Sequence, residues 1–260
     1  MSLENGILKT AGPVSSVIYP ESDGLPMADN TKQFEAIVSV KSNIELLYVN
    51  DPHVFVAGNL FWYPVEGDNT IRQAPDVLVA YGRPKGHRGS YQQWNEENIA
   101  PQVVFEILSP GNRKKEMDEK FAFYECYGVE EYYLYDPDRG RLLGWLRNGE
   151  AKLTPIARMI GWVSPRMDIR FSLAGKELKL EFPDGAPFLT FAELAHLREE
   201  AEAHALEELF ARADVEEALV QSEQARVAAE TRAAAEAEAR LLLEAKLREA
   251  EEKLRKAGLL

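Results

Sequence analysis

The chain has 260 residues, of which 45% are hydrophobic and 10% aromatic, a composition that supports a folded core and excludes wholesale disorder. Its 30 Lys and Arg stand against 43 Asp and Glu, and the net charge of -13 argues against a protein that coats nucleic acid nonspecifically. The single cysteine, Cys126, excludes an intrachain disulfide and any multi-cysteine metal site, and we expect it to be a buried core thiol. There is no long apolar run and no leader-like start, so a cytoplasmic protein with no membrane partner is expected.

The first part of the chain is predicted to contain an irregular lead-in, a helix and two strands. Residues 1–28, with several prolines, form the lead-in. Residues 29–31 offer good N-caps, and apolar side chains then recur with helical spacing up to Tyr48, so a helix is expected there. The run 53–63 is typical of one strand with a glycine irregularity. Residues 76–80 are nearly all apolar, which predicts a strand buried on both faces.

The next part continues the same alternation of strands and helices. A polar loop is expected over 82–98, a buried strand over 103–108 and a turn over 109–112. Apolar residues on one helical face then lead to Gly128, a natural C-cap. Further strands are predicted over 131–135, 141–147 and 150–182. Together these elements predict an α/β fold in which helices flank a mixed sheet.

The composition changes near residue 188, which divides the chain into the lead-in, a globular domain over 29–187 and a helical tail over 188–260. The tail lacks proline and is rich in Ala, Glu, Leu and Arg. Its end contains a heptad-like seam, which predicts a coiled coil with a second copy or another partner, formed by Leu243, Leu247, Ala250, Leu254 and Ala257. The alternative is a solvated single helix held by charge pairs such as Glu249 with Lys253.

Two carboxylates lie inside otherwise apolar strands. Asp76 opens one strand and Glu106 interrupts another. Such a carboxylate costs several kcal/mol, roughly, unless it is paired or binds a metal. If neighbouring strand ends bring the two together, they form an oxygen site suited to Mg²⁺ or Mn²⁺.

Lys120 is a third candidate for the same site. The turn after Glu106 returns the chain as a helix, and this helix can direct Lys120 toward Glu106. Two carboxylates, a divalent metal and a lysine suit phosphodiester hydrolysis, because the metal activates water and the lysine orients it or neutralises phosphate. The structural alternative is that Asp76 caps a turn and that Glu106 and Lys120 form an ion pair without catalytic function.

Three segments, in this order, resemble the motifs of the PD-(D/E)xK nuclease superfamily. They are APDVLV at 74–79, FEILSPGN at 105–112 and KFAFYECYGVEEYYLYDP at 120–137. The third narrows the resemblance to the "putative restriction endonuclease" domain of bacterial proteins. The resemblance covers residues from about 30 to 185.

The resemblance implies a restriction-endonuclease-like fold and a metal site. Asp76 and Glu106 would be metal ligands, and the backbone carbonyl of Ile107 would be a further ligand. In some members a glutamate of the first helix, here Glu35, completes the site.

The usual lysine of the superfamily falls two residues after the second acid, and this chain has Leu108 there. The resemblance therefore implies that the lysine function has moved to Lys120. Glu116 stands where relatives often have Asp, a smaller departure.

Basic residues follow both candidate strands and are candidate contacts to nucleic acid phosphates. If both segments line one groove, the contacts would come from Arg83, Lys85, Arg88, Arg113, Lys114 and Lys115. The alternative is that they are ordinary solvated charges.

Two functions follow from these observations. The first is a metal-dependent endonuclease that acts on DNA and dimerises through its tail. The second is an inactive nuclease-fold scaffold that binds partners through the helical tail, a hypothesis favoured by Leu108 and by the acidic charge.

Overall fold

The computed structural model describes residues 17–24, 26, 28–149 and 152–256. Most of the predicted lead-in, and Ala257 at the end of the predicted seam, therefore lie outside the described residues. The chain divides into two units, with the boundary between Phe191 and Ala192. Each unit is described by itself below.

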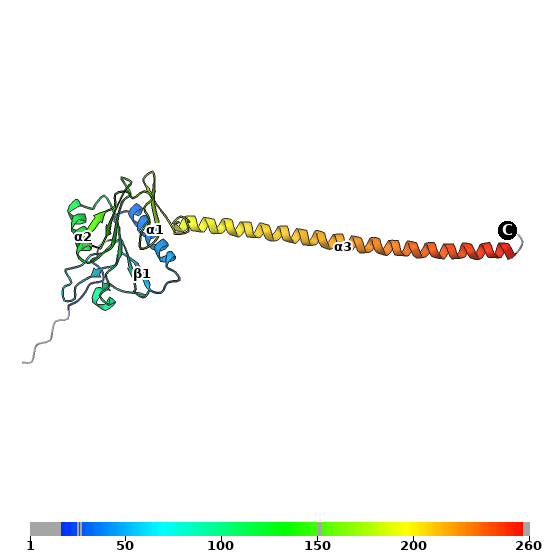
Figure 1. Ribbon diagram of the computed structural model, residues 1–260, viewed down its shortest axis with the longest axis horizontal. Helices are drawn as coiled ribbons and strands as arrows, with labels where there is room; N and C mark the ends of the chain where they lie inside the picture. Colours follow the sequence, from blue (N-terminus) through cyan, green and yellow to red (C-terminus); the bar gives the residue numbers. More distant parts are fainter. Residues whose placement is uncertain (1–16, 25, 27, 150–151, 257–260) are drawn as a thin grey trace, which may run out of the picture. The chain divides into compact units, whose positions relative to one another are not determined.

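The first unit is an α/β domain, and a long helix follows it (Figure 1). In chain order the elements are α1 (Thr31–Leu47), β1 (Val54–Gly58), β2 (Trp62–Tyr63), β3 (Val77–Tyr81), β4 (Tyr91–Gln92), η1 (Gln93–Glu96), β5 (Val103–Ile107), α2 (Lys114–Cys126), β6 (Glu131–Asp136), β7 (Arg141–Arg147), β8 (Leu153–Pro155), β9 (Arg170–Ala174), β10 (Glu177–Glu181) and α3 (Phe191–Lys256). The predicted α/β fold, with a mixed sheet flanked by helices and a long C-terminal helix, is confirmed.

The central sheet has six strands in the order β1-β3-β5-β6-β7-β8. Strands β5 and β6 are parallel, and every other neighbouring pair in this sheet is antiparallel. A parallel pair needs a crossover connection, which α2 supplies between β5 and β6. Strands β3 and β5 run in opposite directions, with Val77 opposite Phe105 and Val79 opposite Val103.

The two faces of the sheet carry separate hydrophobic clusters, one beneath each helix. Ile37, Val40 and Ile44 of α1 pack with Val77 and other odd-numbered residues of β3 and β5. Even-numbered residues of the same strands pack on the opposite face with Tyr124 and other residues of α2. Because both faces are covered, β3 and β5 are apolar at nearly every position, as the sequence predicted.

Helix boundaries follow local sequence signals. The side chain of Asn30 accepts a hydrogen bond of 2.9 Å from Gln33 N at the start of α1, as expected for an N-cap. After α2, Gly128 adopts a φ of +94°, which suits glycine and ends the helix.

Two predicted segments are wrong in detail. Residues 53–63 do not form one strand, because Asn59 adopts a φ of +50° and turns the chain between β1 and β2. The loop predicted over 82–98 contains β4 and η1, and β4 pairs with β2 in a small separate sheet. A two-residue strand is too short to give a periodic sequence signal.

Cys126 is exposed, so the prediction of a buried thiol is wrong. Lys120 and Tyr124, four residues apart, lie on the face of α2 toward the sheet. Cys126 follows Tyr124 by two residues and therefore points in nearly the opposite direction around the helix.

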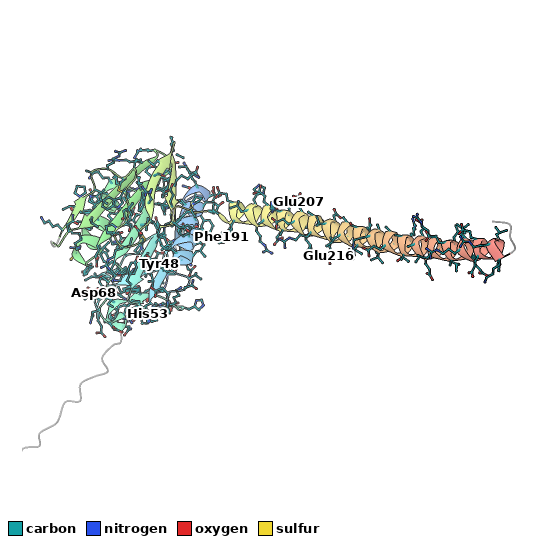
Figure 2. The ribbon with its side chains drawn as sticks, turned by 45° about the vertical axis from the view of Figure 1, so that its right-hand side comes forward. Tyr48, His53, Asp68, Phe191, Glu207 and Glu216 are labelled. Carbon is teal, nitrogen blue, oxygen red and sulfur yellow. The ribbon has the colours of Figure 1, made fainter. Side chains whose placement is uncertain are left out.

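Helix α3 has no buried residue along its 66 residues. Side chains such as Glu207 and Glu216 project from the helix, and ion pairs four residues apart, such as Arg226 with Glu230 at 2.6 Å, run along it (Figure 2). The coiled coil stays a prediction. Within the described part of the chain, no helix has the length and apolar character needed to cross a membrane.

Candidate active site

The strand register brings the two predicted carboxylates together. Val77 lies opposite Phe105 in the antiparallel pair, so the preceding Asp76 continues the register opposite Glu106. Both even-numbered positions face the α2 side of the sheet, and opposite residues on one face are close neighbours. Asp76 and Glu106 are only 6% and 3% exposed.

The side chains of this pair are held by hydrogen bonds from two elements, β5 and α2. Asp76 Oδ2 accepts a bond of 2.6 Å from the backbone N–H of Ile107. Glu106 Oε2 accepts one of 2.8 Å from Lys120 Nζ, and Glu106 Oε1 accepts one of 2.5 Å from the hydroxyl of Tyr124. Lys120 and Tyr124 are four residues apart on α2, which aligns them on one face of that helix.

This cluster holds two buried carboxyl groups and one cation, Lys120. Burial first, and the neighbouring Glu106 second, raise the pKa of Asp76 to about 8. Burial alone would lower the pKa of Lys120, but Glu106 and Asp76 outweigh it and the pKa is raised. Lys120 therefore stays an ammonium ion paired with Glu106, and the raised pKa leaves Asp76 mostly protonated near neutral pH.

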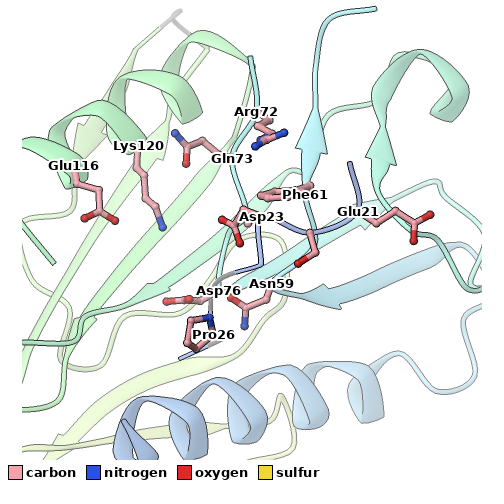
Figure 3. A pocket seen from close by; sticks show the side chains of 12 residues that line it. Glu21, Asp23, Pro26, Asn59, Phe61, Arg72, Gln73, Asp76, Glu116 and Lys120 are labelled. Atoms are coloured by element: carbon pink, nitrogen blue, oxygen red, sulfur yellow. The ribbon is translucent and has the colours of Figure 1, made fainter. Parts of the chain in front are cut away.

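The cluster opens into a cavity of about 390 Å³. Figure 3 shows Asp76, Lys120 and Glu116 on one side of it and Arg72, Phe61 and Asn59 nearby. The cavity is thus formed by the ends of strands, by α2 and by four residues near the start of the described chain, Glu21, Ser22, Asp23 and Pro26. Glu106 lies behind Lys120 as its hydrogen-bond partner.

Helix α1 contributes to the site through a residue that the sequence did not indicate. Glu35 is exposed, so its side chain does not complete the site. Gln33 is buried instead, and its Nε2 donates a bond of 2.8 Å to the carbonyl oxygen of Ile107. The carbonyl predicted as a metal ligand thus already accepts one hydrogen bond and keeps a second lone pair.

The donor set fits a hard divalent cation. Lys120 compensates only one of the two buried carboxyl groups, so a cation beside Asp76 would favour its ionised form. Both groups present oxygen atoms, and Ile107 adds a backbone oxygen. Among the described residues, no three or more His, Cys, Asp or Glu are grouped to hold a metal. A site with two carboxylates suits Mg²⁺, which retains several waters, better than it suits a metal that needs a complete protein cage.

The expectation that both basic segments line one groove is wrong. Strands β3 and β5 are antiparallel, so the segments that follow them lie at opposite ends of the sheet. Asp76 precedes β3 and lies near Ile107, whereas Arg83, Lys85 and Arg88 follow β3 and lie at its other end. These three residues are therefore separated from the carboxylates by the length of the strand.

Their side chains are also engaged in holding their own loop. Arg83 and Arg88 pair with Glu96 at 3.1 and 2.5 Å, and their side chains are only 8% and 13% exposed. Lys85 donates to the carbonyl oxygens of Tyr48 and Val49. These contacts explain the three basic residues without a nucleic acid.

The other basic segment lies beside the cavity. Arg113 precedes α2, and Lys114 and Lys115 begin it, just before the cavity residue Glu116. The side chains of Lys114 and Lys115 are 89% and 87% exposed and pair loosely with acids one turn later. This segment remains available for contacts to phosphate.

Tyr124 is the second site residue that the sequence analysis missed, having been assigned only to the apolar face of the helix. Burial, and then Glu106, raise its pKa well above 10, so the hydroxyl stays protonated and donates to Glu106. Its spacing of four residues from Lys120 was the available signal. Both residues hold Glu106, one at each carboxylate oxygen.

We expect Tyr124→Phe to lower the free energy of unfolding by about 1–2 kcal/mol, because a buried carboxylate oxygen loses its donor. Urea denaturation followed by tryptophan fluorescence measures this, since all four tryptophans lie in the first unit. Tyr127→Phe, at the C-cap of the same helix, is the matched control, because the described residues give the Tyr127 hydroxyl no hydrogen-bond partner. Equal losses in the two variants would contradict this assignment.

Comparisons with known proteins place the domain over residues 30–186 in a family. No curated protein matches the chain. One solved structure, the crystal structure of a "putative nuclease belonging to DUF820" from Anabaena variabilis, is 17% identical with a TM-score of 0.39, covering 52% of this chain and 72% of that one. Residues 30–186, more than half of the chain, match the model of the Uma2 family, described as "Putative restriction endonuclease". The resemblance inferred from the three motifs is thereby confirmed, and the chain belongs to the Uma2 family of restriction-endonuclease-like nucleases.

Proposed function

We propose that this protein is a Mg²⁺- or Mn²⁺-dependent endonuclease that hydrolyses phosphodiester bonds in DNA. The observation that carries the proposal is that Asp76 and Lys120 line one cavity of a nuclease-family domain, with Glu106 hydrogen-bonded to Lys120 beside it. DNA is the proposed substrate because the family description names restriction endonucleases, which act on DNA.

Asp76, Glu106 and the carbonyl of Ile107 would hold the metal. When bound, the metal supplies a Lewis acid and lowers the pKa of a coordinated water. Lys120 cannot remove a proton from that water, because its raised pKa keeps it protonated. It can instead donate hydrogen bonds to the attacking water or to a phosphate oxygen and offset developing negative charge.

Lys120 can also replace the superfamily lysine, whose usual position is occupied by Leu108 in this chain. The superfamily lysine would reach the site from the same strand as the acid. Here Lys120 Nζ lies 2.8 Å from Glu106 Oε2, and the ammonium group comes from α2 instead. The chemical group is therefore present beside the acid although its usual position is occupied by leucine.

Dimerisation through α3 is part of the proposal, because cutting both strands of a duplex needs two active sites. Leucines near the end of α3 support it, with Leu243, Leu247 and Leu254 being 69%, 61% and 41% exposed. These side chains would pair with those of a second copy.

Calorimetric titration with Mn²⁺, combined with cleavage of supercoiled plasmid, tests the function. We expect the wild type to bind Mn²⁺ and cut, and Glu106→Gln to lose measurable binding and cleavage, because the site loses half of its carboxylate charge. Glu119→Gln removes an exposed acid from α2 and is expected to behave as the wild type.

Two results would contradict the proposed function. One is a Glu106→Gln protein that binds and cuts normally. The other is a wild type that neither binds Mn²⁺ nor cuts DNA, which would favour the inactive scaffold acting through α3.

A further inference from the structure

Arg72 and Asn59 line the same cavity as Asp76 and Lys120, and the proposed chemistry uses neither of them. The residues lining this cavity include two cations, Lys120 and Arg72. Lys120 is already paired with Glu106. A phosphodiester anion entering the cavity would therefore meet Arg72 as the lining cation that no carboxylate of the described residues pairs with.

Arg72 is held in place without being neutralised. Its guanidinium carbon lies 4.6 Å from the centroid of the Phe61 ring, and its Nη1 donates a bond of 3.3 Å to the hydroxyl of Tyr63. No carboxylate of the described residues lies within ion-pair distance of it. Most of its five N–H donors thus remain free in a fixed orientation, which suits a phosphate group.

The backbone beside Arg72 is fixed as well. Gln73 and Trp62 exchange two backbone hydrogen bonds of 2.8 and 3.2 Å. The chain then runs through Pro75 directly to Asp76. Arg72 is therefore anchored four residues before a proposed metal ligand, on a segment with little freedom to move.

The side chain of Asn59 gives independent evidence for a ligand at this site. Its Nδ2 is buried and has no hydrogen-bond partner among the described residues. Buried donors are nearly always paired, so an unpaired donor on a residue that lines a cavity marks a place where a ligand can supply the acceptor that the described residues do not. A phosphate oxygen is such an acceptor.

Asn59 also has a left-handed backbone conformation next to the site. Its φ of +50° is uncommon for a residue other than glycine. Its N–H donates to the carbonyl oxygens of Pro75 and Asp76 at 3.1 and 3.3 Å. These bonds tie Asn59 to the residue that would bind the metal, and Figure 3 shows the two side chains next to each other.

We infer that Arg72 and Asn59 bind a backbone phosphate of the nucleic acid strand beside the two carboxylates. The inference rests on the proposed nuclease function and adds two substrate-binding residues to the same site. Arg72 supplies charge and a planar pair of donors, and Asn59 supplies one neutral donor. Such contacts position the strand without reading its sequence.

The inference about Arg72 and Asn59 is tested by measuring DNA binding and DNA cleavage separately. Fluorescence anisotropy with labelled DNA duplex and labelled single strand is carried out in Ca²⁺, with gel analysis to verify intact probe. Arg72→Met is expected to weaken binding roughly tenfold or more and to lower the slope of log affinity against log salt by about one. The loss should be the same for two unrelated sequences, because phosphates carry no sequence information.

Asn59→Gly separates binding from folding. Glycine tolerates the φ of +50° and removes the unpaired donor, so the melting temperature should stay equal or rise while affinity falls several-fold. A residue with a merely structural function would instead lower the melting temperature. Arg158→Met, which removes an exposed arginine outside the cavity, is the control.

Affinities of Arg72→Met and Asn59→Gly equal to that of Arg158→Met would overturn the inference, and so would a wild type that binds neither probe. Failure of the nuclease proposal is distinct from both. In that case the wild type would bind DNA in Ca²⁺ and the two variants would bind it more weakly, but the wild type would not cleave DNA when Mn²⁺ replaces Ca²⁺.

Discussion

Replacing Lys120 with glutamine is expected to lower DNA cleavage by about 10³-fold or more while leaving Mn²⁺ binding nearly intact. The two carboxylates that would hold the metal remain, but the ammonium group 2.8 Å from Glu106 is lost. Glutamine can still donate a hydrogen bond to Glu106, so the buried acid keeps a partner. The measurement is the single-turnover cleavage rate at saturating Mn²⁺, together with calorimetry.

Two further variants make this result specific. Lys120→Arg keeps the positive charge and should retain more cleavage than Lys120→Gln. Lys179→Gln removes an equal charge from a pair with Glu177 on β10, outside the cavity, and should cut as the wild type. Cleavage by Lys120→Gln at the wild-type rate would show that Lys120 is only a structural partner of Glu106.

Asp76→Asn is expected to stabilise the metal-free protein, although it should abolish cleavage. Burial, and then Glu106, raise the pKa of Asp76 from 3.8 to about 8. The contribution of Asp76 to stability is therefore fully present below pH 4 and is lost as the pH rises towards 8. Asparagine does not ionise, so at pH 8 the variant should exceed the wild type by about 2–4 kcal/mol in the free energy of unfolding.

The groups that face Asp76 are consistent with this rise of its pKa. Glu106 and Asp29 repel its charged form, whereas Lys120 and the N–H of Ile107 favour it without outweighing burial. Urea denaturation in EDTA between pH 5 and 9 measures the difference. Asp118→Asn, an exposed change on α2, is the control and should show no such growth with pH.

Adding metal is expected to reverse the order of stability between the wild type and Asp76→Asn. Saturating Mn²⁺ is expected to stabilise the wild type and to have little effect on Asp76→Asn, since binding to the folded state alone raises stability by mass action. A wild type that is more stable than Asp76→Asn in EDTA at pH 8 would show that the buried charge is already compensated.

The principal site residues were recognisable because their placement in the sequence is costly. Asp76 and Glu106 interrupt apolar strands, and a carboxylate is not retained there without a partner or a metal. Lys120 was recognisable from the turn and helix that follow Glu106. The structure brings these three side chains to one place, and the Uma2 family match supports a nuclease.

The remaining parts of the site depend on contacts between distant segments. Gln33 lies four residues before the buried Ile37, on a helical face that Glu35 does not share. That spacing indicates that Gln33 is buried, but it does not show that Gln33 reaches Ile107 across 74 positions of the chain. Arg72 and Asn59 belong to segments with weak periodicity, in which strands of two residues alternate with turns. Their common cavity exists only once β1, β2 and β3 have been assembled.

Taken alone, the sequence determined the alternation of helices and strands, the two buried faces of β3 and β5, the long C-terminal helix and the acids that need a cation. These follow from periodicity and from the cost of burying charge, which are local properties. The tertiary structure alone decided that β3 and β5 are antiparallel. That direction sets Asp76 beside Glu106, separates Arg83, Lys85 and Arg88 from them, and selects the basic residues that can reach the site. Strand direction depends on pairing between segments far apart in the chain, so the pattern of one strand does not contain it.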